Sequence, residues 1–328
     1  MNTLLDRFGR MIEYLRVSVT DKCNLRCIYC MPEQGICSKP QEEILRFEEI
    51  LRFVQCAAEL GISKIRVTGG EPLVRRGIID FIGQLSKVPG IKEISMTTNG
   101  TLLKDAAWQL KENGLTRVNV SLDTLNAEKF MHMTRWGKLE EVWSGIEAAL
   151  EAGLTPVKIN TVIMRGFNDH QIMDFVNLTM RKPLHVRFIE LMPIGESDGW
   201  WQDAFLPARH VLRLIQKQYD LKVSVGLAGN GPASCYQLPG SQGSIGFITA
   251  ISEHFCSACN RMRLTSDGKL RPCLQDSYEV DVKPALRGDQ TEEKLKELIL
   301  RAVSMKPVRH HLVEGWKGQE RLMSDIGG

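Results

Sequence analysis

The sequence contains no long hydrophobic run and no large excess of charge of one sign. Nowhere in its 328 residues do enough uncharged apolar residues follow one another to form a membrane-spanning helix. The 42 basic and 39 acidic side chains give a net charge of +3, which is too even to indicate a nucleic-acid partner. Charged side chains interrupt residues 1–10, unlike the apolar core of a secretory signal. These features predict a cytoplasmic protein with no membrane or nucleic-acid partner.

Low-complexity segments are also lacking, and the only repeat is an alternation of short β-branched runs with longer segments of helical period. The short runs predict strands at 14–19, 64–68, 93–98, 117–122, 157–163 and 185–191. The longer segments predict helices at 42–60, 76–88, 104–113, 138–152 and 168–181. This alternation is typical of a parallel sheet covered by helices. We therefore expect an α/β fold, an incomplete TIM-like (β/α)6 barrel.

The alternation ends near residue 192. A stretch rich in glycine and serine follows at 226–246, between further helices expected near 208–219 and 291–302. The sequence thus predicts a partial barrel at 1–192 and a C-terminal extension at 193–328 that covers the barrel mouth and ends in two glycines.

Cysteine is the informative residue, because cytosolic thiols stay reduced and the nine present do not predict a disulfide scaffold. Three stand apart and are expected to be inert packing residues: Cys37, Cys56 and Cys235. The other six form two groups of three.

The first group has C-x3-C-x2-C spacing directly after the first predicted strand, and consists of Cys23, Cys27 and Cys30. Active sites of TIM-like barrels lie at this carboxyl end of the strands. Three thiolates can hold three irons of a four-iron cluster and leave the fourth iron open. A structural zinc ion is the alternative, although only Cys37 lies nearby as a fourth ligand.

The second group has C-x2-C-x13-C spacing and consists of Cys256, Cys259 and Cys273. By spacing alone, a zinc site completed by His254 or Cys235 is as plausible as a cluster. Two neighbouring cations, Arg261 and Arg263, favour a cluster with an anionic group bound near its open iron.

Five cations lie inside predicted strands: Arg16, Lys64, Arg66, Lys158 and Arg187. Helices cover the outside of a barrel, so a strand cation that pointed outward would be buried at high cost. Glu93 and Glu190 are candidate partners for one or two of them. The remainder predict an inward-facing polyphosphate pocket.

The first cysteine group resembles the signature of the radical S-adenosylmethionine (SAM) superfamily, with Tyr29 at its aromatic position. The segment Thr68–Pro72 resembles the superfamily's Gly-Gly-Glu-Pro element, whose glycines allow the backbone to approach the cofactor closely. This resemblance implies a [4Fe-4S] cluster on Cys23, Cys27 and Cys30 that cleaves SAM and yields a 5′-deoxyadenosyl radical.

Over nearly the whole chain, the sequence also resembles the radical enzymes that cyclise GTP at the start of molybdenum-cofactor biosynthesis. Matching stretches include residues 66–73, 97–100, 121–123, 187–192 and the terminal glycines. In that family the radical takes hydrogen from ribose C3′, and C3′ then bonds to guanine C8, giving (8S)-3′,8-cyclo-7,8-dihydroguanosine 5′-triphosphate. No catalytic side chain is assigned beyond the cluster ligands.

The resemblance implies a role for each remaining site residue. It implies SAM contacts from Tyr29, Gly70, Ser121 and Met192. It implies GTP contacts from Arg16, Lys64, Arg66, Thr97, Lys158, Arg187, Arg261 and Arg263. It places the guanine at the open iron of a second [4Fe-4S] cluster on Cys256, Cys259 and Cys273.

The family further implies an external electron donor and a downstream cyclic pyranopterin monophosphate synthase, and it leaves a homodimer open. Two alternatives remain. A two-cluster radical enzyme that modifies a peptide would need a long neutral groove. A zinc or iron-sulfur protein that binds without catalysis would leave the Gly-Gly-Glu-Pro segment and the strand cations unexplained.

Overall fold

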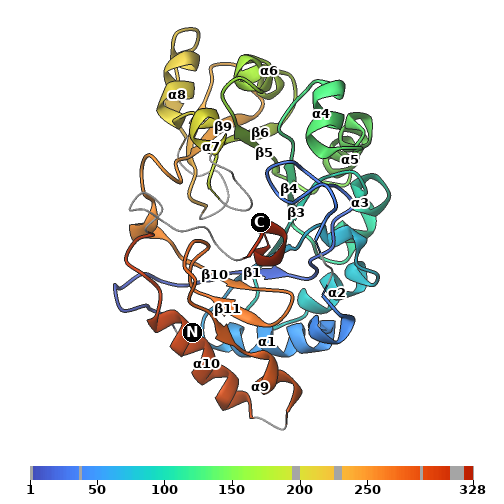
Figure 1. Ribbon diagram of the computed structural model, residues 1–328, viewed down its shortest axis with the longest axis vertical. Coiled ribbons are helices and arrows are strands. Elements are labelled where there is room, and N and C mark those ends of the chain that lie inside the picture. The colour runs from blue at the N-terminus through green and yellow to red at the C-terminus, as the bar shows by residue number, and fades with distance from the viewer. Residues whose placement is uncertain are drawn as a thin grey trace.

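The computed structural model describes residues 3–36, 39–193, 200–224, 231–288, 291–310 and 321–327. Six parallel strands follow one another in chain order through one curved sheet (Figure 1). They are β1 (Tyr14–Ser18), β2 (Lys64–Thr68), β3 (Glu93–Thr98), β4 (Arg117–Ser121), β5 (Val157–Ile163) and β6 (Leu184–Glu190). All six match predicted strands to within one residue at each end, and the partial TIM-like barrel is confirmed.

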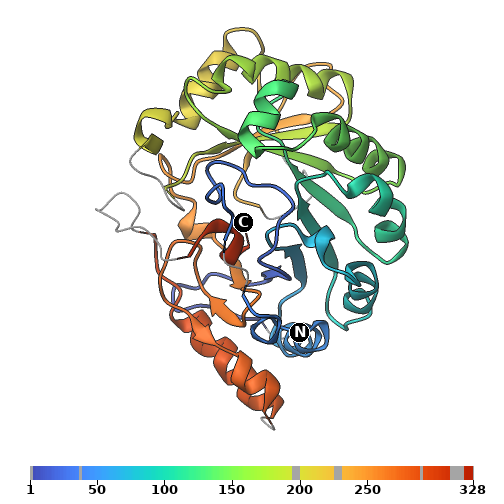
Figure 2. The same cartoon turned by 45° about the vertical axis from the view of Figure 1, so that its right-hand side comes forward.

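Helices cover the outside of this sheet (Figures 1 and 2). They are α1 (Phe47–Glu59), α2 (Ile78–Leu85), α3 (Leu103–Glu112), α4 (Ala127–Thr134), α5 (Leu139–Glu151) and α6 (Ile172–Arg181). Helix α1 begins later than predicted, because Gln41–Glu43 form a separate 3-10 turn and Arg46 is extended. Helix α4 was not predicted; the Asn126 side chain accepts a hydrogen bond from the Lys129 N–H and caps it.

Two further parallel strands come from the C-terminal part of the chain. Strand β9 (Ser244–Ile248) pairs with β6, and strand β10 (Arg261–Leu264) pairs with β1. Antiparallel strands then extend both flanks: β7 (Lys222–Val223) and β8 (Ser234–Gln237) beside β9, and β11 (Lys269–Arg271) and β12 (Val280–Asp281) beside β10. The sequence did not predict β9 and β10 because both are short and interrupted by glycine or arginine.

The remaining helices are α7 (Trp200–Ala204), α8 (Ala208–Gln216), α9 (Lys283–Arg287), α10 (Glu292–Ser304) and α11 (Met323–Ile326). Helix α11 lies within the ring of strands in both ribbon views (Figures 1 and 2). Gly327 follows it in a left-handed conformation, and a Cβ atom there would lie 2.9 Å from side-chain atoms of Ser18 and Thr68. Glycine therefore permits this close approach to β1 and β2. None of the described helices is long and apolar enough to cross a membrane.

Candidate functional site

A cavity of about 330 Å³ lies inside the curved sheet and is lined by residues of both cysteine groups. The first group occupies the loop after β1, at the carboxyl end of the parallel strands. In the second group, Cys256 and Cys259 precede β10, the strand that pairs with β1, and Cys273 follows β11, which pairs with β10. Because β10 is the neighbour of β1, the fold brings both groups to one cavity although they lie far apart in the sequence. The six lining cysteines are Cys23, Cys27, Cys30, Cys256, Cys259 and Cys273.

The sulfur atoms of neither cysteine trio are gathered as closely as the ligands of a single metal ion. Among the described residues, neither cysteine trio has all three sulfur atoms within 4.8 Å of one another. Four thiolates around one zinc ion would lie closer, since each Zn–S bond is about 2.3 Å long. Thiolates of a four-iron cluster bind separate irons and need wider spacing. Each trio thus offers three ligands suited to a cluster with one open iron.

The sequence analysis left open a zinc site completed by His254, and the structure contains part of such a site. Ligand atoms of His254, Cys256 and His310 lie within 4.8 Å of one another. Two of these residues already contact each other, since His254 Nδ1 lies 3.1 Å from His310 Nε2. The other candidate, Cys235, lies on β8, and its thiol donates to the Ala233 carbonyl at 3.6 Å.

The first cysteine loop is partly buried. Burial and the neighbouring thiols raise the pKa of Cys27 well above its usual value, and burial raises the pKa of Cys30 to about 12. Binding to iron would compensate this cost, because metal coordination stabilises thiolates. The Tyr29 hydroxyl donates to Asp123 Oδ2 at 2.6 Å, which ties the loop to the end of β4. Burial raises the pKa of Asp123 to about 6.

The Gly-Gly-Glu-Pro segment is hydrogen-bonded to the start of the same loop. Gly70 donates its N–H to the Thr20 carbonyl at 2.8 Å, and Glu71 donates its N–H to the Lys22 carbonyl at 2.8 Å. The buried Glu71 carboxylate accepts hydrogen bonds from the Thr98 hydroxyl at 2.8 Å and the Asn99 N–H at 2.6 Å. These contacts join the loop ends of β1, β2 and β3 into one support for the first cysteine group.

Substitution Gly70→Ala is expected to displace this loop. A Cβ atom at Gly70 would lie 2.4 Å from the Lys22 carbonyl oxygen and 2.7 Å from that of Asp21, and both obstacles are backbone atoms. We expect reduced SAM affinity and reduced iron at the first group, measured by titration and iron analysis after anaerobic reconstitution. The control is Gly166→Ala: this glycine has a positive φ, yet a Cβ atom there would meet no other described atom within 4 Å. Equal SAM affinity and iron content in Gly70→Ala and Gly166→Ala would contradict the expected displacement.

Buried cations organise the second cysteine group. The Lys306 ammonium donates to the carbonyls of Arg261 at 2.7 Å and Pro272 at 2.6 Å, and thus joins the segments that carry Cys259 and Cys273. Although burial opposes ionisation, the charges of Arg261 and Lys306 lower the pKa of Cys259 to about 6. At neutral pH, Cys259 is therefore largely a thiolate, the form of cysteine that binds metal.

A row of arginines crosses the sheet beside the second group. Arg263, Arg16 and Arg66 are register partners on β10, β1 and β2, and all three line the cavity. Register partners on adjacent strands lie about 5 Å apart, so the guanidinium groups repel one another. Burial and the charges of Arg263 and Arg66 lower the pKa of Arg16 well below its usual value, and burial with the charge of Arg261 lowers the pKa of Arg263 to about 9. Burial of such a row of positive charges without an anion costs free energy. The row therefore favours binding of a multiply charged anion.

The structure places most predicted contact residues at the cavity wall. Those that line it are Arg16, Tyr29, Arg66, Gly70, Thr97, Ser121, Arg187, Met192, Arg261 and Arg263. Two predicted GTP contacts are not among the lining residues. Lys64 forms an ion pair with Glu13 at 2.9 Å, so a contact with substrate would require this pair to open. Lys158 is buried, and burial together with the charge of Arg187 lowers its pKa to about 6.

The candidate carboxylate partners of the strand cations have other roles. Glu93 pairs with Arg117, a strand cation that the sequence analysis did not single out. Glu190 accepts hydrogen bonds from backbone N–H groups of Ala208 and Ile251. Sequence reasoning also missed several residues of the cavity wall: Arg117, Asn119, Asp123, Asn160 and Lys306. Those on strands lie at positions that alternate with apolar residues, which is the signal that could have identified them.

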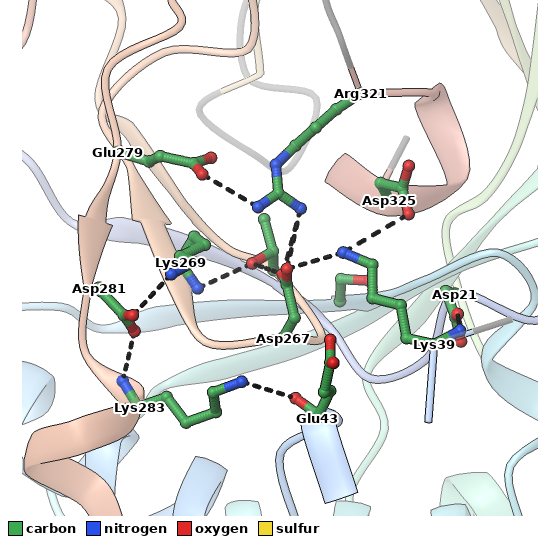
Figure 3. A network of polar contacts seen from close by, with 12 residues as sticks. Asp21, Lys39, Glu43, Asp267, Lys269, Glu279, Asp281, Lys283, Arg321 and Asp325 are labelled. Carbon is green, nitrogen blue, oxygen red and sulfur yellow. Dashed lines mark hydrogen bonds and ion pairs between the residues drawn. The ribbon is translucent and has the colours of Figure 1, made fainter. Parts of the chain in front are cut away.

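The C-terminal helix α11 is held in the cavity by charge. Arg263 donates to the Gly327 carbonyl at 2.8 Å. Figure 3 shows Asp267 between two cations: it contacts Lys39 at 2.7 Å and Arg321 at 3.1 Å. Lys39 also reaches Asp325 of α11 at 3.9 Å. Despite burial, hydrogen bonds from Lys39 and Thr265 keep the pKa of Asp267 well below its usual value.

Substitution Asp267→Asn is expected to loosen α11. It removes the negative charge that both Lys39 and Arg321 contact, and charge-assisted hydrogen bonds contribute about 1.5–3 kcal/mol each. We expect amide hydrogen exchange in residues 323–327 to accelerate roughly tenfold or more, because about 1.4 kcal/mol corresponds to a factor of ten. The matched control is Asp281→Asn, which breaks the more exposed ion pair with Lys269 on β11 and β12. Equal exchange rates in both variants would show that Asp267 does not hold the helix.

Comparison with known proteins identifies the family. Residues 17–179 match the model of the Radical SAM superfamily, and residues 184–312 match that of Molybdenum Cofactor Synthesis C. The chain is 53% identical over 323 residues to the GTP 3′,8-cyclase of Moorella thermoacetica, covering 98% of this chain and 99% of the relative. It is 52% identical to the GTP 3′,8-cyclase of Pelotomaculum thermopropionicum, with 98% and 99% coverage.

Solved structures agree on the fold. Streptococcus suis SuiB bound to S-adenosylmethionine superimposes with a TM-score of 0.63 at 15% identity, covering 92% of this chain and 68% of SuiB. Native anSMEcpe with bound AdoMet gives a TM-score of 0.56 at 16% identity, with 92% and 82% coverage. With its site geometry and its full-length relatives taken together, the chain belongs to the GTP 3′,8-cyclase family of the Radical SAM superfamily.

Proposed function

We propose that this protein cyclises GTP to (8S)-3′,8-cyclo-7,8-dihydroguanosine 5′-triphosphate, the first step of molybdenum-cofactor biosynthesis. The observation that carries the proposal is one cavity that joins two cysteine trios to a row of in-register arginines. Full-length relatives at about half identity bear the name of this activity, which supports the proposal.

Both cysteine trios are assigned to [4Fe-4S] clusters. Membership in the Radical SAM superfamily implies a SAM-binding [4Fe-4S] cluster, and we assign it to Cys23, Cys27 and Cys30. We assign a second cluster to Cys256, Cys259 and Cys273, because these three thiols line the same cavity as the first trio. When bound, the first cluster and SAM supply a 5′-deoxyadenosyl radical that can abstract a hydrogen atom.

The protein's own side chains bind and orient the substrate. The arginine row binds the triphosphate through charge-assisted hydrogen bonds, with Arg187 of β6 also on the cavity wall. Arg261 lies between this row and the second trio, where its guanidinium is 3.6 Å from Cys259 Sγ. The guanine then lies toward the second trio and the ribose toward the first. Tyr29, Gly70, Ser121 and Met192 surround SAM at the carboxyl ends of the strands.

Partners follow from this chemistry. Reductive cleavage of SAM requires an electron from outside the chain, so we propose an external electron donor. The cyclised triphosphate is an intermediate of the pathway. We therefore propose that a downstream synthase converts it to cyclic pyranopterin monophosphate. A homodimer also remains a proposal.

Anaerobic reconstitution tests the function. We expect two four-iron clusters per chain, and 5′-deoxyadenosine only when GTP, SAM and reductant are all present. Zinc instead of iron at both trios, with no deoxyadenosine, would favour a binding protein without catalysis. Turnover with a peptide and none with GTP would favour the peptide-modifying alternative.

A further inference from the structure

A buried amide on the cavity wall has no hydrogen-bond partner among the described residues. Asn119 lies in the middle of β4 and is 1% exposed. Within the described ranges, neither its Nδ2 nor its Oδ1 atom has a hydrogen-bond partner. A buried polar group without a hydrogen bond is costly, and about nine in ten or more such groups are satisfied in folded proteins. Asn119 lines the cavity, so a bound molecule can supply the missing contacts.

A hydroxyl group on the neighbouring strand has the same property. Thr97 on β3 is the register partner of Asn119 and also lines the cavity. The part of the chain that the structure describes offers no hydrogen-bond partner to Thr97 Oγ1. Two adjacent strands thus present an amide and a hydroxyl at the same level of one cavity wall. Together they can donate and accept hydrogen bonds, which matches the chemistry of sugar hydroxyls.

The position of this pair along the strands identifies the part of the substrate that it meets. The register row of Arg66 continues through Ser95 to Arg117, and Asn119 lies two residues nearer the carboxyl end of β4 than Arg117. The loop of the first cysteine group lies beyond that carboxyl end. Asn119 is therefore one layer above the arginine row and below the first trio. The next step rests on the proposed function. If the triphosphate of GTP binds to the arginine row and SAM binds at the first cysteine loop, the ribose of GTP lies between the two, at the level of Asn119.

We propose that Asn119, assisted by Thr97, is a positioning residue that binds the ribose hydroxyls of GTP and holds C3′ toward the radical source. SAM also contains a ribose, whose hydroxyl groups could bind Asn119 in the same way. The substrate ribose is favoured because Ser121, two residues nearer the carboxyl end on the same face of β4, separates Asn119 from the loop. A hydrogen bond to the 2′-hydroxyl leaves the C3′ hydrogen unobstructed.

The test compares GTP with 2′-deoxy-GTP in binding to the anaerobically reconstituted protein, by calorimetric titration. We expect the wild-type protein to bind GTP roughly tenfold more tightly, since a net hydrogen bond contributes on the order of that factor. In Asn119→Ala the two affinities should become equal, with SAM affinity unchanged. Asn119→Ser, which keeps a shorter hydrogen-bonding side chain at this position, should retain part of the discrimination. The Asn119→Ala variant should also release more deoxyadenosine per cyclised product, because C3′ is less well placed.

An apolar variant of similar size distinguishes a binding role of Asn119 from a structural role. Asn119→Leu removes the unsatisfied amide, so without nucleotide it should unfold at the same or a higher temperature than the wild type, while losing the discrimination. A merely structural asparagine would give lower stability in this variant. Unchanged discrimination in Asn119→Ala would overturn the assignment, and loss of SAM affinity with discrimination retained would assign Asn119 to the SAM ribose instead. A wild-type protein that binds neither nucleotide would refute the proposed function itself.

Discussion

Substitution Cys27→Ser is expected to reduce deoxyadenosine formation to background and to remove about half of the reconstituted iron, because each of two trios holds one four-iron cluster. Cys27 lies half-buried in the first loop, where a serine hydroxyl, a far weaker iron ligand than a thiolate, cannot replace it. The remaining iron should belong to the second trio, whose ligands lie before β10 and after β11 and do not depend on the first loop. Iron and sulfide analysis with electron paramagnetic resonance of the reduced protein measures both losses.

Cys56→Ala is the matched control. Cys56 is buried in the hydrophobic core on α1 and is not a lining residue of the cavity. We expect it to keep both clusters and to form deoxyadenosine at the wild-type rate. Full iron content and deoxyadenosine formation in Cys27→Ser would refute the assignment of the first cluster.

Substitution Arg263→Ala is expected to weaken GTP binding by about tenfold to a hundredfold, the range that corresponds to a charge-assisted hydrogen bond of about 1.5–3 kcal/mol. Arg263 belongs to the arginine row and lies close to Arg261, so it meets the triphosphate in a poorly solvated place. The first cluster should stay intact, since Arg263 is not a ligand. Calorimetric titration at several salt concentrations should show a shallower salt dependence in the variant, because one fewer cation contributes.

The stability of the nucleotide-free protein gives an independent readout. Arg263 stays protonated at neutral pH, but its lowered pKa means that the charge is less favourable in the folded than in the unfolded protein. The substitution removes this cost but also the hydrogen bond to the Gly327 carbonyl, so the unfolding temperature should change little even though GTP binding is weakened. Lys182→Ala, which removes a cation that pairs with Glu147 on the outer surface, is the control and should bind GTP normally. Unaltered GTP affinity in Arg263→Ala would mean that the triphosphate lies elsewhere.

The sequence by itself determined the parts of this protein that depend on local spacing. The alternation of apolar runs and helical segments predicted all six strands β1 to β6, because burial on both faces of a parallel sheet requires such runs. The two cysteine spacings and the Gly-Gly-Glu-Pro segment indicated the radical chemistry, because metal ligands and close backbone approaches need fixed short intervals.

Only the tertiary structure decided how distant segments meet. The pairing of β10 with β1 sets Arg263 beside Arg16 and brings the second cysteine trio to the cavity of the first. No periodicity in the sequence records such a pairing, since register between remote strands is fixed by packing of the whole sheet. The same holds for Lys64, whose partner Glu13 lies on the segment before β1, and for Asn119, whose lack of a partner among the described residues is visible only when its surroundings are known. Local intervals specify which chemistry is possible, and long-range packing specifies where it takes place.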